Sequence, residues 1–87
     1  MQPWYLYIAK ARTGRYYTGI TTNPLARLAK HNSGLGAKFA VQQGPFELVY
    51  VSQTLESKSE ARKREVLVKS WSQKKKEMLI KGEWSLL

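Results

Sequence analysis

The sequence contains no cysteine, which excludes disulfide bonds and zinc sites built on thiolates. A chain without disulfides suits a reducing compartment, so we expect a cytoplasmic location. The sequence also lacks any apolar run approaching the ~20 residues needed to cross a bilayer. Its first residues lack the basic and apolar segments of a signal peptide. An anionic membrane surface would need an amphipathic helix with a large apolar face, and none is clear, so we expect no membrane partner.

Acidic residues are scarce as well. Six Asp and Glu stand against fifteen Lys and Arg, which gives a formal net charge of +9 and an isoelectric point near 10.1. A positive surplus of this size on a small surface attracts polyanions, and nucleic acid is the leading candidate. Composition leaves open a basic protein without a dedicated partner. The 87 residues, 43% of them hydrophobic, are enough for a single domain over residues 1–87 with one modest core.

The N-terminal part of the chain is predicted to form a hairpin. Residues 2–10 are rich in aromatic and branched side chains and alternate as a strand does, and residues 15–21 are typical of the returning strand. The glycine in the intervening ARTGR stretch suits the turn. Regular alternation in both strands places Tyr7 on the same face as Tyr17 and Gly19.

A helix is predicted to follow the hairpin directly. Thr22 or Asn23 provides a cap at its start, and Gly34 can close it in a left-handed conformation. Within it, Leu25 and Leu28 are expected to lie on one apolar stripe.

The rest of the chain is predicted to contain one more strand and two more helices. These elements are a loop or short helix at 35–45, a strand at 46–52, a helix from a cap at Ser57 or Ser59 to about Trp71, and a helix from Ser72 to Gly82. The order ββαβαα predicts a mixed α/β fold of the α+β type, in which helices flank a small three-stranded antiparallel sheet.

Several short motifs occur along this framework at a characteristic spacing. They are LYI at 6–8, YTG at 17–19, Arg27, His31 with Asn32, GAKF at 36–39, and a helical Glu65. Together they resemble the GIY-YIG nuclease superfamily, and most closely its small standalone bacterial members, over roughly residues 3–82. The resemblance implies a metal-dependent endonuclease that hydrolyses DNA phosphodiester bonds with low sequence specificity, in DNA repair or recombination.

The two strand tyrosines have a structural and a functional interpretation. Tyr7 and Tyr17 on one face would form at least a cross-strand aromatic pair with their hydroxyls at the rim. A phenol titrates near pH ~10, so it needs nearby cations to accept a proton at neutral pH, and this chain has many. The resemblance implies that Tyr17, or Tyr7 with it, assists the attacking water. The sequence leaves open which of them acts.

Arg27 and His31 are four residues apart and therefore share one face of their predicted helix. A guanidinium can hold two phosphate oxygens and stabilise their growing charge, and the resemblance gives Arg27 this role. His31 either relays a proton or binds phosphate, or it hydrogen-bonds the last carbonyls of its helix.

Glu65 is one of only six acidic residues and lies beside Ala61 and Val68, at the edge of the buried stripe of its helix. On its own it could simply form an ion pair with Lys69, one helical turn later. The resemblance makes Glu65 the ligand of one divalent cation, Mg²⁺ or Mn²⁺. Such a cation often takes a single protein carboxylate and keeps most of its waters.

Further residues are candidates for contact with the nucleic acid backbone. The candidates are Gly19, Lys38, Lys69, Lys74, Lys75 and Lys76. For Gly19 the alternative is a packing role, and for the lysines it is a solvated surface. Arg64 points toward the buried stripe, where its aliphatic stem can pack while its head reaches water.

The family resemblance also bears on partners. A standalone catalytic domain implies low specificity, or specificity supplied by a partner protein, and branched or nicked DNA is a reasonable substrate. A second hypothesis keeps the basic face and the hairpin but has no turnover, as a nucleic-acid-binding module that contacts phosphates.

Overall fold

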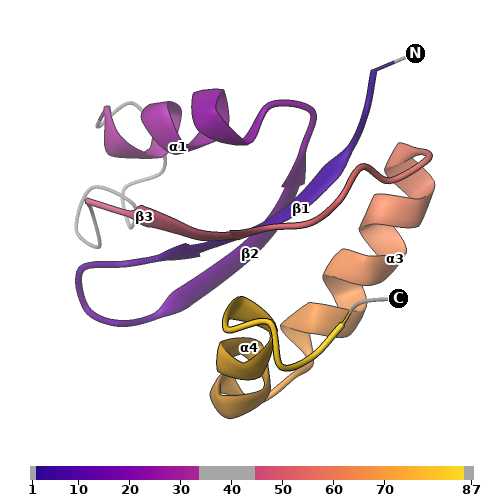
Figure 1. The fold of residues 1–87 in the computed structure, drawn as a ribbon. Helices are drawn as coiled ribbons and strands as arrows, with labels where there is room; N and C mark the ends of the chain where they lie inside the picture. Colours follow the sequence, from indigo (N-terminus) through magenta and orange to yellow (C-terminus); the bar gives the residue numbers. More distant parts are fainter. Residues whose placement is uncertain (1, 34–44, 86–87) are drawn as a thin grey trace.

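The computed structural model describes residues 2–33 and 45–85. Its elements are β1 (Tyr5–Lys10), β2 (Tyr16–Thr21), α1 (Pro24–Asn32), β3 (Glu47–Val51), α3 (Lys58–Lys69) and α4 (Gln73–Ile80) (Figure 1). The order ββαβαα and the α+β class are as predicted. Gly34, Lys38 and most of the predicted loop or short helix at 35–45 lie outside the described residues.

The sheet has the strand order β2-β1-β3, and both pairs are antiparallel. The central strand β1 aligns Tyr7 with Gly19 and Ala9 with Tyr17 across the hairpin. Tyr7 and Tyr17 therefore lie diagonally on one face, which confirms the prediction from alternation. The strands β2 and β3 form the two edges of this sheet.

Helices cover both faces of the sheet, with α1 on one face and α3 and α4 on the other (Figure 1). Alternate residues of β1 divide between two apolar clusters. Toward α3 and α4 the buried cluster includes Leu6, Ile8, Ala61, Val68 and Leu79. Toward α1 it includes Tyr7, Ala9, Ala11 and Phe46, with Leu28 packed against them. Because successive side chains of a strand point to opposite faces of the sheet, β1 contributes to both clusters.

Each helix begins with a side chain that accepts a backbone N–H, as its sequence suggests. Asn23 accepts from Ala26 at 3.1 Å, Ser57 from Glu60 at 3.1 Å, and Ser72 from Lys75 at 3.2 Å. Asn23 and Ser57, rather than Thr22 and Ser59, are therefore the caps. Gly82 follows α4 with φ of +81°, the left-handed conformation expected of a helix-ending glycine.

Three local predictions differ from the structure. The strand β1 starts at Tyr5 rather than at residue 2, and Trp4 makes only an isolated bridge to Leu55. The helix α3 ends at Lys69 rather than near Trp71, because Ser72 already caps the next helix in an extended conformation. Leu25 is 73% exposed. Residues three apart on a helix are neighbours, but Leu25 lies in the first turn of α1, and only Leu28 packs against the cluster of Tyr7 and Phe46.

Within the described residues, none of the helices has both the length and the apolar character to cross a membrane.

Candidate active site

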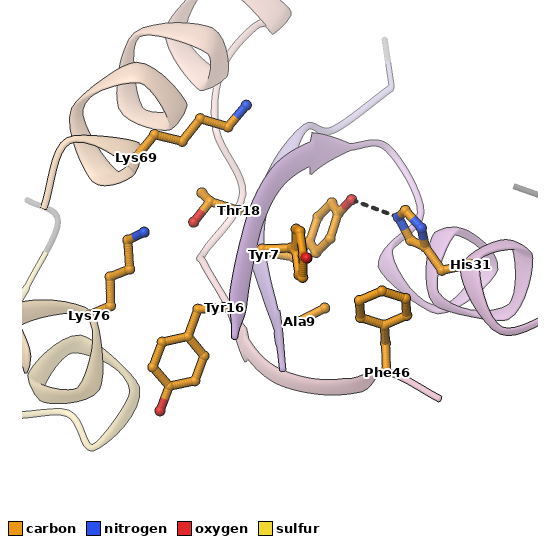
Figure 2. Close-up of a pocket in the computed structure, with 9 residues that line it drawn as sticks. Tyr7, Ala9, Tyr16, Thr18, His31, Phe46, Lys69 and Lys76 are labelled. Carbon is orange, nitrogen blue, oxygen red and sulfur yellow. Dashed lines mark hydrogen bonds between the residues drawn. The ribbon is translucent and has the colours of Figure 1, made fainter. Parts of the chain in front are cut away.

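A cavity of about 310 Å³ opens beside the edge strand β2 (Figure 2). It is lined by Tyr7, Ala9, Tyr16, Tyr17, Thr18, His31, Phe46, Lys69 and Lys76. These residues come from the hairpin, from α1 and Phe46 (just before β3) on one face of the sheet, and from α3 and α4 on the other. The cavity thus brings residues of both faces together around β2.

Tyr7 lies at the centre of this arrangement. Its hydroxyl is 3.4 Å from Nε2 of His31 (Figure 2). Burial raises the pKa of Tyr7. Arg27 lowers this pKa through its charge and a side-chain hydrogen bond, but by less than burial raises it, and the charge of Glu65 raises it further. Tyr7 therefore keeps its proton at neutral pH. The expectation that neighbouring cations would lower the pKa is wrong for Tyr7, because burial outweighs the guanidinium.

His31 provides a matching acceptor. Burial lowers its pKa below the usual 6.5, and the charges of Arg27 and Lys30 lower it further. A neutral imidazole predominates at pH 7 as a result, so Nε2 can accept a hydrogen bond from the Tyr7 hydroxyl. The ring of His31 also lies 5.4 Å from that of Phe46.

Arg27 lies on an exposed part of α1, one turn before His31. Its charge acts on both Tyr7 and His31, which places the guanidinium at the same site. The predicted sharing of one helix face by Arg27 and His31 agrees with this placement.

Gly19 serves the packing of Tyr7. A Cβ atom built at this position would lie only 2.5 Å from the Tyr7 hydroxyl oxygen and 2.7 Å from the ring carbon that bears it. The side chain of Tyr7 therefore fills the space beside Gly19. The packing role considered for Gly19 accounts for this glycine, and the approach of a phosphate to its backbone is not needed to explain it.

Glu65 projects from α3 at the edge of its buried stripe, as the sequence predicts. It is only 8% exposed, and its neighbours Ala61 and Val68 are buried. Its carboxylate lies 3.3 Å from Nζ of Lys69 and 3.6 Å from Nε of Arg62. Lys69 also lines the cavity, so this ion pair lies at the cavity wall.

Glu65 and Tyr7 interact through charge across the sheet. The charge of Glu65 is close enough to raise the pKa of Tyr7, although the two residues come from opposite faces of the sheet. No cluster of three or more His, Cys, Asp and Glu occurs among residues 2–33 and 45–85. A metal ion held there would rely on the single carboxylate of Glu65, with water and substrate as its other ligands, which fits the habits of Mg²⁺.

The lysines of α4 differ in their surroundings. Lys76 lines the cavity. The ammonium group of Lys75 instead lies 4.5 Å from the ring of Trp71 and 4.7 Å from that of Trp84. Lys74 is exposed and lines none of the described cavities. Of the three neighbours, Lys76 is therefore best placed to reach a ligand in the cavity.

Sequence reasoning missed the role of Asn32. Its amide donates to the Phe46 carbonyl at 3.0 Å and accepts from the Phe46 N–H at 2.7 Å. This pair of bonds joins the end of α1 to the start of β3 and holds Phe46 edge-on to Tyr17, with ring centroids 5.4 Å apart. The sequence signal was the His31-Asn32 dipeptide, but the partner of Asn32 is fourteen residues away and only the fold identifies it.

Arg64 follows the expectation for a snorkelling side chain. Its side chain is 21% exposed, and its guanidinium lies 3.3 Å from the Glu60 carboxylate, one turn earlier on α3.

The fold is a small α+β domain, and comparison with known proteins identifies its family. Residues 3–78 match the GIY-YIG catalytic domain. The chain belongs to this family, and GIY-YIG nucleases generally use divalent metals.

The most informative relatives are small bacterial proteins. The chain is 44% identical to the UPF0213 protein SH2523 of Staphylococcus haemolyticus, covering 92% of this chain and 96% of that protein. It is 43% identical to a UPF0213 protein of Staphylococcus aureus, and the match covers 93% of this chain and 98% of that protein.

Two solved structures are similar as well. The solution NMR structure of the UPF0213 protein BH0048 from Bacillus halodurans has 43% identity and a TM-score of 0.57, covering 91% of this chain and 83% of that chain. The solution NMR structure of the protein EF2693 from E. faecalis has 34% identity and a TM-score of 0.63, and the match covers 94% of this chain and 86% of that chain.

Proposed function

We propose that this chain is a divalent-metal-dependent endonuclease that hydrolyses DNA phosphodiester bonds with low sequence specificity. One observation carries the proposal: the Tyr7 hydroxyl from β1 meets His31 from α1 and is influenced by the charges of Arg27 and Glu65. A proton acceptor, a phosphate-binding cation and a carboxylate are the groups that phosphodiester hydrolysis requires.

The Tyr7–His31 pair supplies the proton acceptor for the attacking water. Tyr7 passes its proton to Nε2 of His31 and takes one from the water, whose oxygen forms the new bond to phosphorus. The bond from phosphorus to the leaving oxygen breaks, and that oxygen takes a proton from solvent. Tyr17 lines the same cavity and is the alternative partner of the water.

Arg27 binds the scissile phosphate. Its guanidinium can donate to two phosphate oxygens at once and stabilise the charge that grows on them as water attacks. Its exposure on α1 leaves it accessible to a DNA backbone. Its influence on the pKa of Tyr7 supports a position near the attacking water.

Glu65 would hold one Mg²⁺ or Mn²⁺ ion. When bound, such an ion neutralises phosphate charge and stabilises the leaving oxygen. The ion pairs of Glu65 with Lys69 and Arg62 orient the carboxylate at the cavity wall. Lys69 must move aside when a cation binds, and it is then available for a phosphate contact.

The substrate we propose is DNA with branches or nicks, in repair or recombination. Low sequence specificity suits recognition of a structural feature of DNA better than recognition of a long sequence. A partner protein would supply further specificity.

The decisive experiment compares Glu65→Gln with the wild-type protein on branched, nicked and linear DNA. We expect cleavage with magnesium, none with chelator, and a loss on the order of 100-fold in Glu65→Gln, since a catalytic metal contributes several kcal/mol. Glu56→Gln, an exposed substitution with the same change in charge, is the matched control and should cleave normally. Equal nicking by the wild type and Glu65→Gln would contradict the proposal.

A second candidate function is a nucleic-acid-binding module without turnover. The observation in its favour is that the Glu65 carboxylate already has two cationic neighbours, at 3.3 and 3.6 Å. A module of this kind would bind the same DNA equally well with magnesium or with chelator and would leave it intact. Binding alone cannot distinguish the two functions, since both predict salt-sensitive affinity.

A further inference from the structure

A second hollow adjoins the cavity of the candidate active site. It has a volume of about 270 Å³ and is lined by Arg15, Tyr16, Tyr17, Gln73 and Lys76. The cavity of the candidate active site shares three of these residues, Tyr16, Tyr17 and Lys76. The two hollows therefore form one groove over these three side chains, which we call the β2 groove. It runs from His31 of α1 to Arg15 at the start of β2.

The β2 groove combines cations with aromatic rings. Figure 2 shows Lys69 and Lys76 on α3 and α4 beside β2, with Tyr16 next to Lys76. Arg15 adds an exposed positive charge at the outer end of the groove. Positive groups that follow a backbone, together with aromatic rings that accept stacked bases, are the features by which proteins bind single-stranded nucleic acid.

Tyr16 is held in place as a wall of the groove. Burial raises the pKa of its hydroxyl, and the charge of the Glu77 carboxylate and a hydrogen bond to it raise that pKa further. Tyr16 also packs against the cluster formed by β1, α3 and α4. A ring fixed at its hydroxyl end loses little conformational freedom when a base lies against it.

We propose that the β2 groove binds a single-stranded DNA segment next to the scissile phosphate. Arg15 and Lys76 contact the phosphate of the neighbouring nucleotide, and its base lies against Tyr16. In a duplex the bases stack on one another and their faces are not open to protein side chains, so the aromatic wall favours an unpaired strand. The inference rests on the proposed nuclease function, since it names the substrate of that site.

The test measures binding without turnover. The full chain carrying Glu65→Gln is titrated, in the presence of chelator, into a fluorescent oligothymidine and into a hairpin duplex of equal charge, with anisotropy as the readout. We expect tighter binding to the single strand. In the same background, Arg15→Gln with Lys76→Gln should weaken single-strand binding about tenfold and reduce the slope of log K against log salt by about 1.4, because each phosphate contact on a single strand contributes roughly 0.7.

The matched control replaces Lys63 and Lys81 with Gln. Both lysines are exposed and line none of the described cavities, and the loss of net charge is the same. We expect this control to change binding less than threefold. A further pair of variants tests the ring: Tyr16→Phe should retain affinity, and Tyr16→Leu should lose about tenfold, since base stacking contributes ~1–3 kcal/mol.

The outcomes separate this inference from the proposed function. Equal losses in the groove variant and its control, or tighter binding of the duplex, would overturn the inference, even if the wild type cleaves DNA. Selective loss in the groove variant supports the inference. If the wild-type protein then fails to cleave, the nuclease proposal fails and single-strand binding by the groove remains.

Discussion

At the scale of single residues, the environment of Tyr7 determines what the site can do. The ring lies against Gly19, the hydroxyl faces His31, and burial keeps the phenol protonated despite the nearby Arg27. A protonated phenol beside a neutral imidazole can transfer a proton but does not itself start as a base. The pair, rather than either member alone, is therefore the functional group.

Replacement of Gly19 by Ala tests the fit of the tyrosine ring. The new methyl group would overlap the Tyr7 side chain, so we expect a loss of about 1–3 kcal/mol in the free energy of unfolding. Urea denaturation provides the measurement. In a Tyr7→Leu background the same substitution should cost far less, because the ring is gone. A cost unchanged by removal of the ring would contradict this account.

The lowered pKa of His31 predicts a dependence of stability on pH. Unfolding restores the ordinary pKa, so between the two values the unfolded state binds more protons and the folded state gains stability as pH rises. We expect the melting temperature to increase from about pH 5 to 7, since an unperturbed His titrates near 6.5. The dependence should diminish in His31→Leu. His31 is the only histidine of the chain, so no other imidazole titrates in this range.

Lys69 is expected to compete with metal ions for Glu65. The Lys69 ammonium lies 3.3 Å from the carboxylate, and removal of this charge frees one oxygen for a cation. Lys69→Met should therefore bind Mn²⁺ about fivefold more tightly, since a partly exposed ion pair contributes up to ~1 kcal/mol. Calorimetric titration without DNA measures this effect. The exposed Lys63→Met is the control, and equal gains in both variants would point to net charge alone.

At the scale of elements, the site depends on the junction between α1 and β3. Asn32 makes both of its bonds to the backbone of Phe46, and Phe46 contacts the rings of Tyr17 and His31. The orientation of α1, and with it that of Arg27, depends on this junction.

Loss of the Asn32 amide should loosen the junction. Asn32→Ala leaves the N–H and carbonyl of Phe46 without their partner, and we expect a loss of about 1–3 kcal/mol in stability. Asn32→Asp keeps the acceptor and loses the donor, so it should be intermediate. Chemical denaturation gives the stability, and NMR shifts of His31 report the position of α1. Unchanged stability in Asn32→Ala would contradict the role of the junction.

The elements themselves were largely predictable from local signals. Asn23, Ser57 and Ser72 are strong caps followed by helical patterns, and Gly82 ends α4 as expected. The ends of β1 and α3 were not predictable to the residue, because they depend on which strand or helix lies alongside. Trp4 has a strand-like sequence, yet only an isolated bridge extends that far.

Motif spacing singled out Tyr7, Arg27, His31 and Glu65, and the structure shows contact between Tyr7 and His31 and an effect of both charges on Tyr7. The interactions within this group were not predictable from the sequence. The raised pKa of Tyr7 could not be foreseen, because it depends on how deeply the ring is buried. The placement of Lys75 over two tryptophans likewise requires the packing of the C-terminal segment on α4.

At the scale of the whole molecule, residues 2–33 and 45–85 form one candidate site, and the two strands of a duplex need separate cuts. Under our proposal one protein molecule breaks one strand at a time. A supercoiled plasmid at limiting protein should therefore accumulate as nicked circles before any linear product forms. Time courses on agarose gels measure the order of products. Direct conversion of supercoiled to linear DNA would instead indicate two chains acting together.

The contact between Gly19 and Tyr7 has a consequence for how such sequences can change. The ring of Tyr7, from the first tripeptide of the hairpin, fills the space beside Gly19 of the second tripeptide. Neither of these two residues can therefore change independently of the other. We expect co-variation across this family: a protein with a side chain at the position of Gly19 should carry a smaller residue at that of Tyr7.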